Sequence, residues 1–206
     1  MEGKIYIFGD SHGIFNFKNI KYNNVINNAS PSITMHRVGR DKLNFINFRS
    51  HNISNNDIII YQFGEIDCRC HIGRQLLFGR QLNTIIDELI NNYIDSIKIN
   101  CSMYNNIKII ICCIPPTMCQ SYYENLHGPI THEFPFVDSD EKRGLYTKLM
   151  NDKLKNECRK NNFIYLDYYT NYVNDINTLK IELSDNICHI NDNTYILNIL
   201  YNVCEI

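Results

Sequence analysis

Short runs of apolar residues recur along the chain and predict five β-strands. Four runs are close to continuous and cover residues 4–8, 57–63, 107–114 and 163–167. A continuous apolar run is typical of a parallel strand that is buried on both faces of a sheet. A fifth run, residues 32–38, alternates between apolar and polar positions and ends at Gly39. We predict that it is the second strand in chain order.

Helical periodicity separates the predicted strands. Apolar residues recur every three to four positions over residues 74–97, 140–161 and 192–203, which predicts three amphipathic helices. Strands that alternate with helices are typical of an α/β fold, in which a parallel sheet lies between two layers of helices. No repeat and no linker rich in Gly, Ser or Pro interrupts this order, so residues 1–206 are predicted to form a single domain.

The net charge and the length of the apolar runs argue against a nucleic-acid-binding protein and a membrane protein. The 206 residues include 20 Lys and Arg and 22 Asp and Glu, which gives a formal net charge of −2. This balance argues against a broad basic face for nucleic acid or for an anionic membrane. No apolar run approaches the ~20 residues that a membrane span needs, and the N-terminal run is too short for a signal peptide. We therefore expect a cytoplasmic protein without a nucleic-acid or membrane partner.

Nine cysteines are scattered along the chain. An odd number without regular spacing predicts reduced thiols that occupy small apolar positions, in keeping with a cytoplasmic location. Cys68 and Cys70 are not followed by a second cysteine pair at the spacing of a zinc site, so no metal is expected.

The candidate chemistry lies at the carboxyl ends of the predicted strands, where open α/β sheets bind their ligands. Ser11 follows the first strand in a Gly-Asp-Ser sequence. A serine at a strand-to-helix turn is a candidate nucleophile, because the helix N-terminus stabilises a developing oxyanion. His189 and Asp185 supply a candidate base and the carboxylate that orients it. Gly39 and Gly64 follow two other predicted strands and are candidate N–H donors to the oxyanion.

Taken together and in this order, these motifs resemble the SGNH/GDSL hydrolases. A subgroup of that family reads Gly-Asp-Ser-His, then Gly-Glu-Ile-Asp-Cys-Arg-x-His, then Ser-Asp-x-x-x-His, as residues 9–12, 64–71 and 184–189 do here. The resemblance implies a three-layer α/β/α, flavodoxin-like fold with a five-stranded parallel sheet in the order 2-1-3-4-5. It also implies that Ser11 is the nucleophile, His189 the base and Asp185 its orienting acid, with N–H groups of Ser11 and Gly39 in the oxyanion hole.

Two positions depart from the family pattern. Ile66 stands where the family usually has an Asn whose side chain donates to the oxyanion. Asn186 stands where the orienting Asp usually lies, because Asp185 is one residue earlier. The loss of a side-chain donor typically costs about 10²–10³ in rate.

Several further polar residues lie beside these motifs and are candidates for lining the pocket. They are Asp10, His12, Glu65, Asp67, Arg69 and His71. Asp10 is expected to hold the turn before Ser11 by accepting backbone N–H groups. The last four alternate at a spacing typical of a strand, and Arg69 is expected to pair with Glu65 or Asp67 rather than with substrate.

The connection between residues 115 and 137 is long for a compact domain, and loops of this length tend to be functional. It contains the aromatic and imidazole side chains of Tyr122, Tyr123, His127 and His132. These rings either stack on a sugar or pack the loop against the domain, and the sequence does not separate the two.

The sequence therefore predicts a serine hydrolase that cleaves or transfers an acyl group, such as an acetyl group on a carbohydrate, with a small-molecule or carbohydrate ester as substrate and without a cofactor. Two alternatives stay open. One is a metal-dependent phosphoesterase that uses Asp10 and His12. The other is an inactive SGNH-like domain that binds a glycan or a protein, for which Ile66 is the main argument. The sequence does not predict an oligomeric state.

Overall fold

The computed structural model describes residues 3–131 and 133–204 and contains one five-stranded parallel sheet. The sheet has the order β2-β1-β3-β4-β5, as the family resemblance implied. Its strands are β1 (Ile5–Gly9), β2 (Val25–Asn27), β3 (Ile58–Gln62), β4 (Lys108–Cys112) and β5 (Ile164–Leu166). β1 and β3 are completely buried, which explains their continuous apolar sequences.

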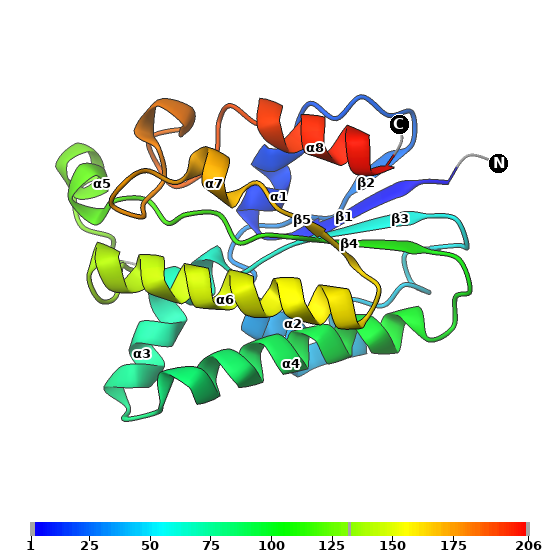
Figure 1. Cartoon of the computed structure of the whole chain (residues 1–206), viewed down its shortest axis with the longest axis horizontal. Coiled ribbons are helices and arrows are strands. Elements are labelled where there is room, and N and C mark those ends of the chain that lie inside the picture. Colours follow the sequence, from blue (N-terminus) through cyan, green and yellow to red (C-terminus); the bar gives the residue numbers. More distant parts are fainter. Residues whose placement is uncertain (1–2, 132, 205–206) are drawn as a thin grey trace.

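Helices cover both faces of the sheet (Figure 1). On one face lie α1 (Ser11–Asn16), α7 (Tyr169–Tyr172) and α8 (Thr194–Cys204). On the other lie α2 (Met35–Asp41), α4 (Leu82–Cys101) and α6 (Asp140–Lys160). Each face has its own apolar core, so the chain forms the predicted three layers.

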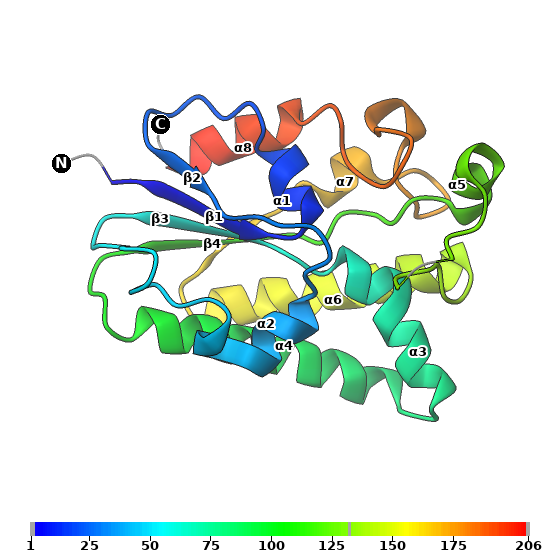
Figure 2. The same cartoon turned by 180° about the vertical axis from the view of Figure 1, so that it is seen from behind.

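Three further helical elements lie near the carboxyl ends of the strands (Figure 2). They are a π-helix, η2 (Asp67–His71), and the helices α3 (Ile72–Leu77) and α5 (Gln120–His127). Two 3₁₀ turns complete the set, η1 (Lys42–Asn44) and η3 (Ile181–Leu183). The single predicted helix over residues 74–97 is therefore two helices. Gly79, at φ +78°, lies in the turn between α3 and α4.

The prediction of a strand over residues 32–38 is wrong, because these residues begin helix α2. The hydroxyl of Thr34 accepts the N–H of Arg37 at 3.0 Å and caps the helix. The second strand is the three-residue β2, which pairs with β1 alone at the edge of the sheet. Two of its three residues are exposed, so β2 has no apolar run that would mark it.

Gly39 consequently lies inside α2 rather than after a strand. A Cβ atom at this position would come within 2.9 Å of the backbone of Asn92 and Tyr93 in α4. Glycine lets α2 and α4 approach closely here.

All nine cysteines have free thiols, most of them buried. Within residues 3–131 and 133–204, no helix is both long enough and apolar enough to cross a bilayer.

Candidate active site

Ser11, His189 and Asp185 form a continuous chain of hydrogen-bonding contacts. Ser11 is the first residue of α1, directly after β1 and Asp10. Its Oγ lies 2.9 Å from Nε2 of His189, and Nδ1 of His189 lies 2.6 Å from Oδ2 of Asp185. The fold thus brings together three residues that are up to 178 positions apart in the sequence.

The turn that carries His189 is organised around the Asp185 carboxylate. Its Oδ1 accepts the N–H groups of Ile187, Cys188 and His189 at 2.9–3.0 Å, while its Oδ2 faces the His189 ring. Burial raises the pKa of Asp185, but the hydrogen bonds from His189 and the backbone outweigh burial and lower the pKa to about 2. Asp185 therefore orients His189 although it lies one residue before the usual family position.

Asn186, which stands at that usual position, faces away from His189. It has φ +64°, and its Oδ1 accepts the hydroxyl of Tyr122 at 2.8 Å. Nε2 of His127 lies 2.9 Å from its backbone carbonyl. Tyr122 and His127 of the long connection thus hold the turn that carries His189. His132, the fourth ring predicted in that connection, lies outside the described residues.

Two neighbours of His189 were not among the residues predicted from the sequence. The Phe15 ring stacks on the His189 ring, with the centroids 4.1 Å apart and the planes 2° from parallel. Phe15 lies one helical turn after Ser11 in α1, and this spacing alone would have pointed to it. Sγ of Cys188 lies 3.4 Å from Nε2 of His189, and burial raises the pKa of this thiol.

His12 is buried and links α1 to the turn that carries His189. Its Nδ1 lies 3.2 Å from Oδ1 of Asp10, and its Nε2 lies 3.0 Å from the carbonyl oxygen of Cys188. A neutral imidazole has one N–H, so the ring can donate to both oxygens only when it is protonated. Burial lowers the pKa of His12, but Asp10 outweighs burial, and the net shift is upward. Asp10 also accepts the N–H of His12 at 2.8 Å, which is the turn-holding contact expected from the sequence.

Glu65 and Arg69 lie one helical turn apart and form a buried ion pair, with Nε to Oε1 at 2.8 Å. Burial raises the pKa of Glu65, but Arg69 and then His12 outweigh it, so the pKa is lowered. Arg69 also donates to the carbonyl of Phe134 in the long connection. The pair is the one expected for Arg69, although the segment is helical and not strand-like.

Asp67 and His71 point elsewhere. The Asp67 carboxylate accepts the N–H groups of Met35 and His36 at 2.7 and 3.2 Å, at the start of α2. Burial raises the pKa of Asp67 to about 7. The ring of His71 faces that of His36, with the centroids 6.3 Å apart. Of the four alternating polar residues predicted to line the pocket, Glu65 and Arg69 lie beside the site, whereas Asp67 and His71 face the start of α2.

The structure keeps two of the three predicted oxyanion donors and removes the third. The N–H of Ser11 opens α1, where no helical carbonyl can accept it. Gly64 lies two residues after the end of β3 and has φ +116°, a conformation that favours glycine. Gly39 is removed as a donor, because it lies within α2 and packs against α4. Ile66 is buried in an apolar cluster with Cys70, Phe134 and Val137.

No group of three or more His, Cys, Asp or Glu side chains in the described part of the chain is arranged to hold a metal ion.

Comparison with solved structures shows which known proteins share the fold of this chain. No protein-family model matches the sequence, and no curated protein sequence matches it significantly. Among solved structures, a Bacteroides fragilis protein assigned as an acylhydrolase is 15% identical, with a TM-score of 0.66. The match covers 99% of this chain and 87% of that one. A GDSL-like lipase from Bacteroides thetaiotaomicron is 12% identical, with a TM-score of 0.63 and coverage of 99% and 88%.

This chain has the SGNH/GDSL hydrolase fold. The OSK domain of Drosophila Oskar also has a similar fold, at 11% identity and a TM-score of 0.58, over 97% of this chain and 88% of that one.

Proposed function

We propose that this protein is a serine esterase in which Ser11, His189 and Asp185 act as the catalytic triad. The observation that carries the proposal is the chain of contacts from Asp185 through His189 to Ser11, at 2.6 and 2.9 Å. A serine hydroxyl needs a base within hydrogen-bond reach, and the base needs a fixed orientation. The fold shared with GDSL-like lipases supports the same chemistry.

In the proposed mechanism, Oγ of Ser11 attacks the ester carbonyl while Nε2 of His189 takes the hydroxyl proton. His189 then donates this proton to the leaving alcohol as the acyl–oxygen bond of the ester breaks. Water attacks the acyl-enzyme with His189 as base, which releases a carboxylic acid and restores Ser11. Asp185 holds the His189 tautomer that has its proton on Nδ1 and stabilises the ring when it becomes cationic.

The oxyanion of the tetrahedral intermediate is proposed to rest on backbone N–H groups. Ser11 and Gly64 are the remaining candidate donors, since Ile66 is apolar and packed into a cluster. His12 lies beside the site, with its ring centroid 5.0 Å from that of His189. The upward shift of its pKa favours the protonated ring, whose positive charge favours the oxyanion without a direct contact.

A carbohydrate acetyl ester is the proposed substrate class. This choice rests on the likeness of residues 9–12, 64–71 and 184–189 to a subgroup of the family. A panel of acetylated sugars and simple acetate esters, assayed by acetate release, tests it. Preference for simple esters over every acetylated sugar would contradict the carbohydrate assignment and leave the triad in place.

The decisive experiment combines a chromogenic acetate ester with a fluorophosphonate probe. We expect wild-type protein to hydrolyse the ester and to become labelled at Ser11, as located by mass spectrometry. Ser11→Ala should lose both properties and keep its circular dichroism spectrum. Ser121→Ala is the matched control, because Ser121 is an exposed serine in α5 and should leave both unchanged.

The same experiment addresses the two alternatives. For a metal-dependent phosphoesterase, Asp10 and His12 would have to ligate a metal, whereas here the His12 nitrogens face Asp10 and Cys188. Inhibition by a chelator with an unchanged Ser11→Ala rate would restore that alternative. Absence of probe labelling in folded protein would favour a binding domain instead.

A further inference from the structure

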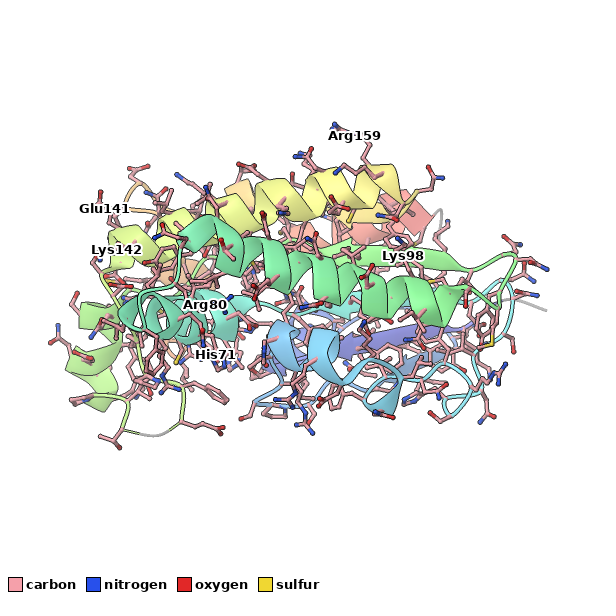
Figure 3. The ribbon with its side chains drawn as sticks, turned by 90° about the horizontal axis from the view of Figure 1, so that it is seen from below. His71, Arg80, Lys98, Glu141, Lys142 and Arg159 are labelled. Atoms are coloured by element: carbon pink, nitrogen blue, oxygen red, sulfur yellow. The ribbon has the colours of Figure 1, made fainter. Side chains whose placement is uncertain are left out.

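A second cavity, of about 490 Å³, lies among α2, α3 and α4 on the face of the sheet opposite α1. Of the described residues that line it, none belongs to the triad. Figure 3 shows His71 and Arg80 together at the α3 end of this face. The volume falls within the range of about 300–1,000 Å³ that is typical of small-molecule sites.

The cavity lining carries more positive than negative charge. Arg40, Lys42 and Arg80 line it, against Glu88 as the single acid among the described lining residues. Arg80 pairs with Glu88 at 2.6 Å, and Arg40 pairs with the neighbouring Asp41 at 2.7 Å. Lys42 makes no ion pair or side-chain hydrogen bond with any described residue. Its ammonium group is thus free to meet a ligand.

Two histidines face each other in the same cavity. The rings of His36 and His71 lie 6.3 Å apart, and neither ring has a hydrogen-bond partner among residues 3–131 and 133–204. Burial, followed by the positive charge of Arg40, lowers the pKa of His36. Burial, followed by His36 and Arg74, lowers the pKa of His71 to about 4. Among the described residues, none places a negatively charged group in the space between the His36 and His71 rings.

We propose that this cavity binds a small molecule through a phosphate group held by His36, His71 and Lys42. Two imidazole rings and one ammonium offer donors from different directions, which suits a dianion with several acceptor oxygens. The cavity is larger than a phosphate ion, so the rest of the ligand occupies the space beside Arg80 and Leu89. The site is independent of ester hydrolysis, since none of the triad residues takes part.

The first test follows the histidine ring signals by NMR during titration with inorganic phosphate at constant ionic strength. The signals of His36 and His71 should shift and saturate, while those of His51 and His127, which do not line this cavity, should stay constant. Acetate, with a single charge, should bind at least about tenfold more weakly. Unchanged His36 and His71 signals, or equal binding of acetate, would overturn the proposal.

The second test removes the free charge. Lys42 has φ +47° and ψ −125°, outside the left-handed helical region that Asn favours, so the circular dichroism spectrum of Lys42→Asn is compared with that of wild type. It should weaken phosphate binding about tenfold, in line with the loss of a charge-assisted hydrogen bond. Arg159→Gln is the matched control, because Arg159 is exposed on α6 and lies far from His71 in Figure 3. His36→Gln, at an exposed position, repeats the test if Lys42→Asn does not fold. Equal weakening in Arg159→Gln, or none in the cavity variants, would contradict the site.

Discussion

His12 joins the two segments that form the triad, and its role can be measured. It bonds the carbonyl of Cys188, the residue before His189, while Asp10 holds its other nitrogen. His12→Ala should lower kcat about tenfold and leave KM nearly unchanged, because a small displacement of His189 is costly for catalysis. His12→Gln keeps a side-chain donor for the Cys188 carbonyl and should recover part of the loss. Wild-type kcat in His12→Ala, from steady-state kinetics with a simple acetate ester, would show that His12 has no positioning role.

Ile66 is the second informative residue. Its side chain packs with Cys70, Phe134 and Val137, so it closes an apolar contact between η2 and the long connection. Ile66→Asn should therefore lower the free energy of unfolding by about 1–3 kcal/mol, because it buries an amide without a partner. Urea denaturation measures this change, with the exposed Ile176→Asn as control. An unchanged stability with higher ester turnover would mean that the new amide reaches the oxyanion instead.

The sequence predicted the residues of the site better than their contacts. Ser11, His189 and Asp185 were proposed from their types and spacing, and the structure brings them together. Phe15 was missed, because its contact with His189 depends on how α1 and the C-terminal turn meet in space. Cys188 was missed although it directly precedes His189 in the sequence. Gly39 was misplaced, because a glycine that ends a strand and one that lets two helices approach look alike in a sequence.

At the scale of elements, the start of α2 depends on a carboxylate from a different segment. Asp67 accepts the first two N–H groups of α2, while the hydroxyl of Thr34 accepts the third, that of Arg37. The pattern 32–38 looked like a strand because Ile33 and Met35 alternate with polar residues, whereas Val38 follows Met35 at helical spacing. The Asp67 carboxylate, which stabilises the start of α2, comes from η2. The local pattern of apolar residues therefore could not predict it.

Asp67 also predicts a pH dependence of stability. Burial raises its pKa in the folded state to about 7, against about 3.9 in an unfolded chain. Between these values the folded state binds more protons than the unfolded state, so the free energy of unfolding should fall as pH rises from about 4 to 7. Asp67→Asn should flatten this slope, as measured by urea denaturation across that range. The matched Asp87→Asn, at an exposed position of α4, should keep it. Equal slopes in wild type and Asp67→Asn would show that Asp67 remains ionised throughout.

At the scale of the whole molecule, the triad joins the two ends of the chain. Ser11 follows the first strand, whereas His189 precedes the last helix, and α1 and α8 lie side by side over the same face of the sheet (Figures 1 and 2). The order of strands and helices predicted that Ser11 lies at the carboxyl edge of the sheet, and the family resemblance implied that His189 meets it there. Neither was sufficient to predict what holds the C-terminal segment in place.

That segment is held by hydrogen bonds to buried groups. The side-chain Nδ2 of Asn193 donates to the carbonyl of Asn16 at 3.0 Å, and the hydroxyl of Tyr172 donates to the carbonyl of Asp192 at 2.8 Å. Both contacts anchor the residues that directly follow the turn carrying His189. The C-terminal turn is therefore expected to open with the whole domain and not by itself.

Amide hydrogen exchange tests this coupling. The N–H groups of Cys188 and His189, which donate to Asp185, should exchange with an opening free energy close to that of the β3 amides. Asn193→Ala removes a donor from the buried carbonyl of Asn16 and a longer contact with that of Phe15, so it should lower the protection of residues 184–190 while β3 stays protected. The control Asn191→Ala removes only an exposed contact with Lys18 and should change neither. Fast exchange of the 184–190 amides in wild-type protein would instead mean that the base reaches Ser11 only in part of the population, and the ester turnover of wild type would then be limited by that fraction.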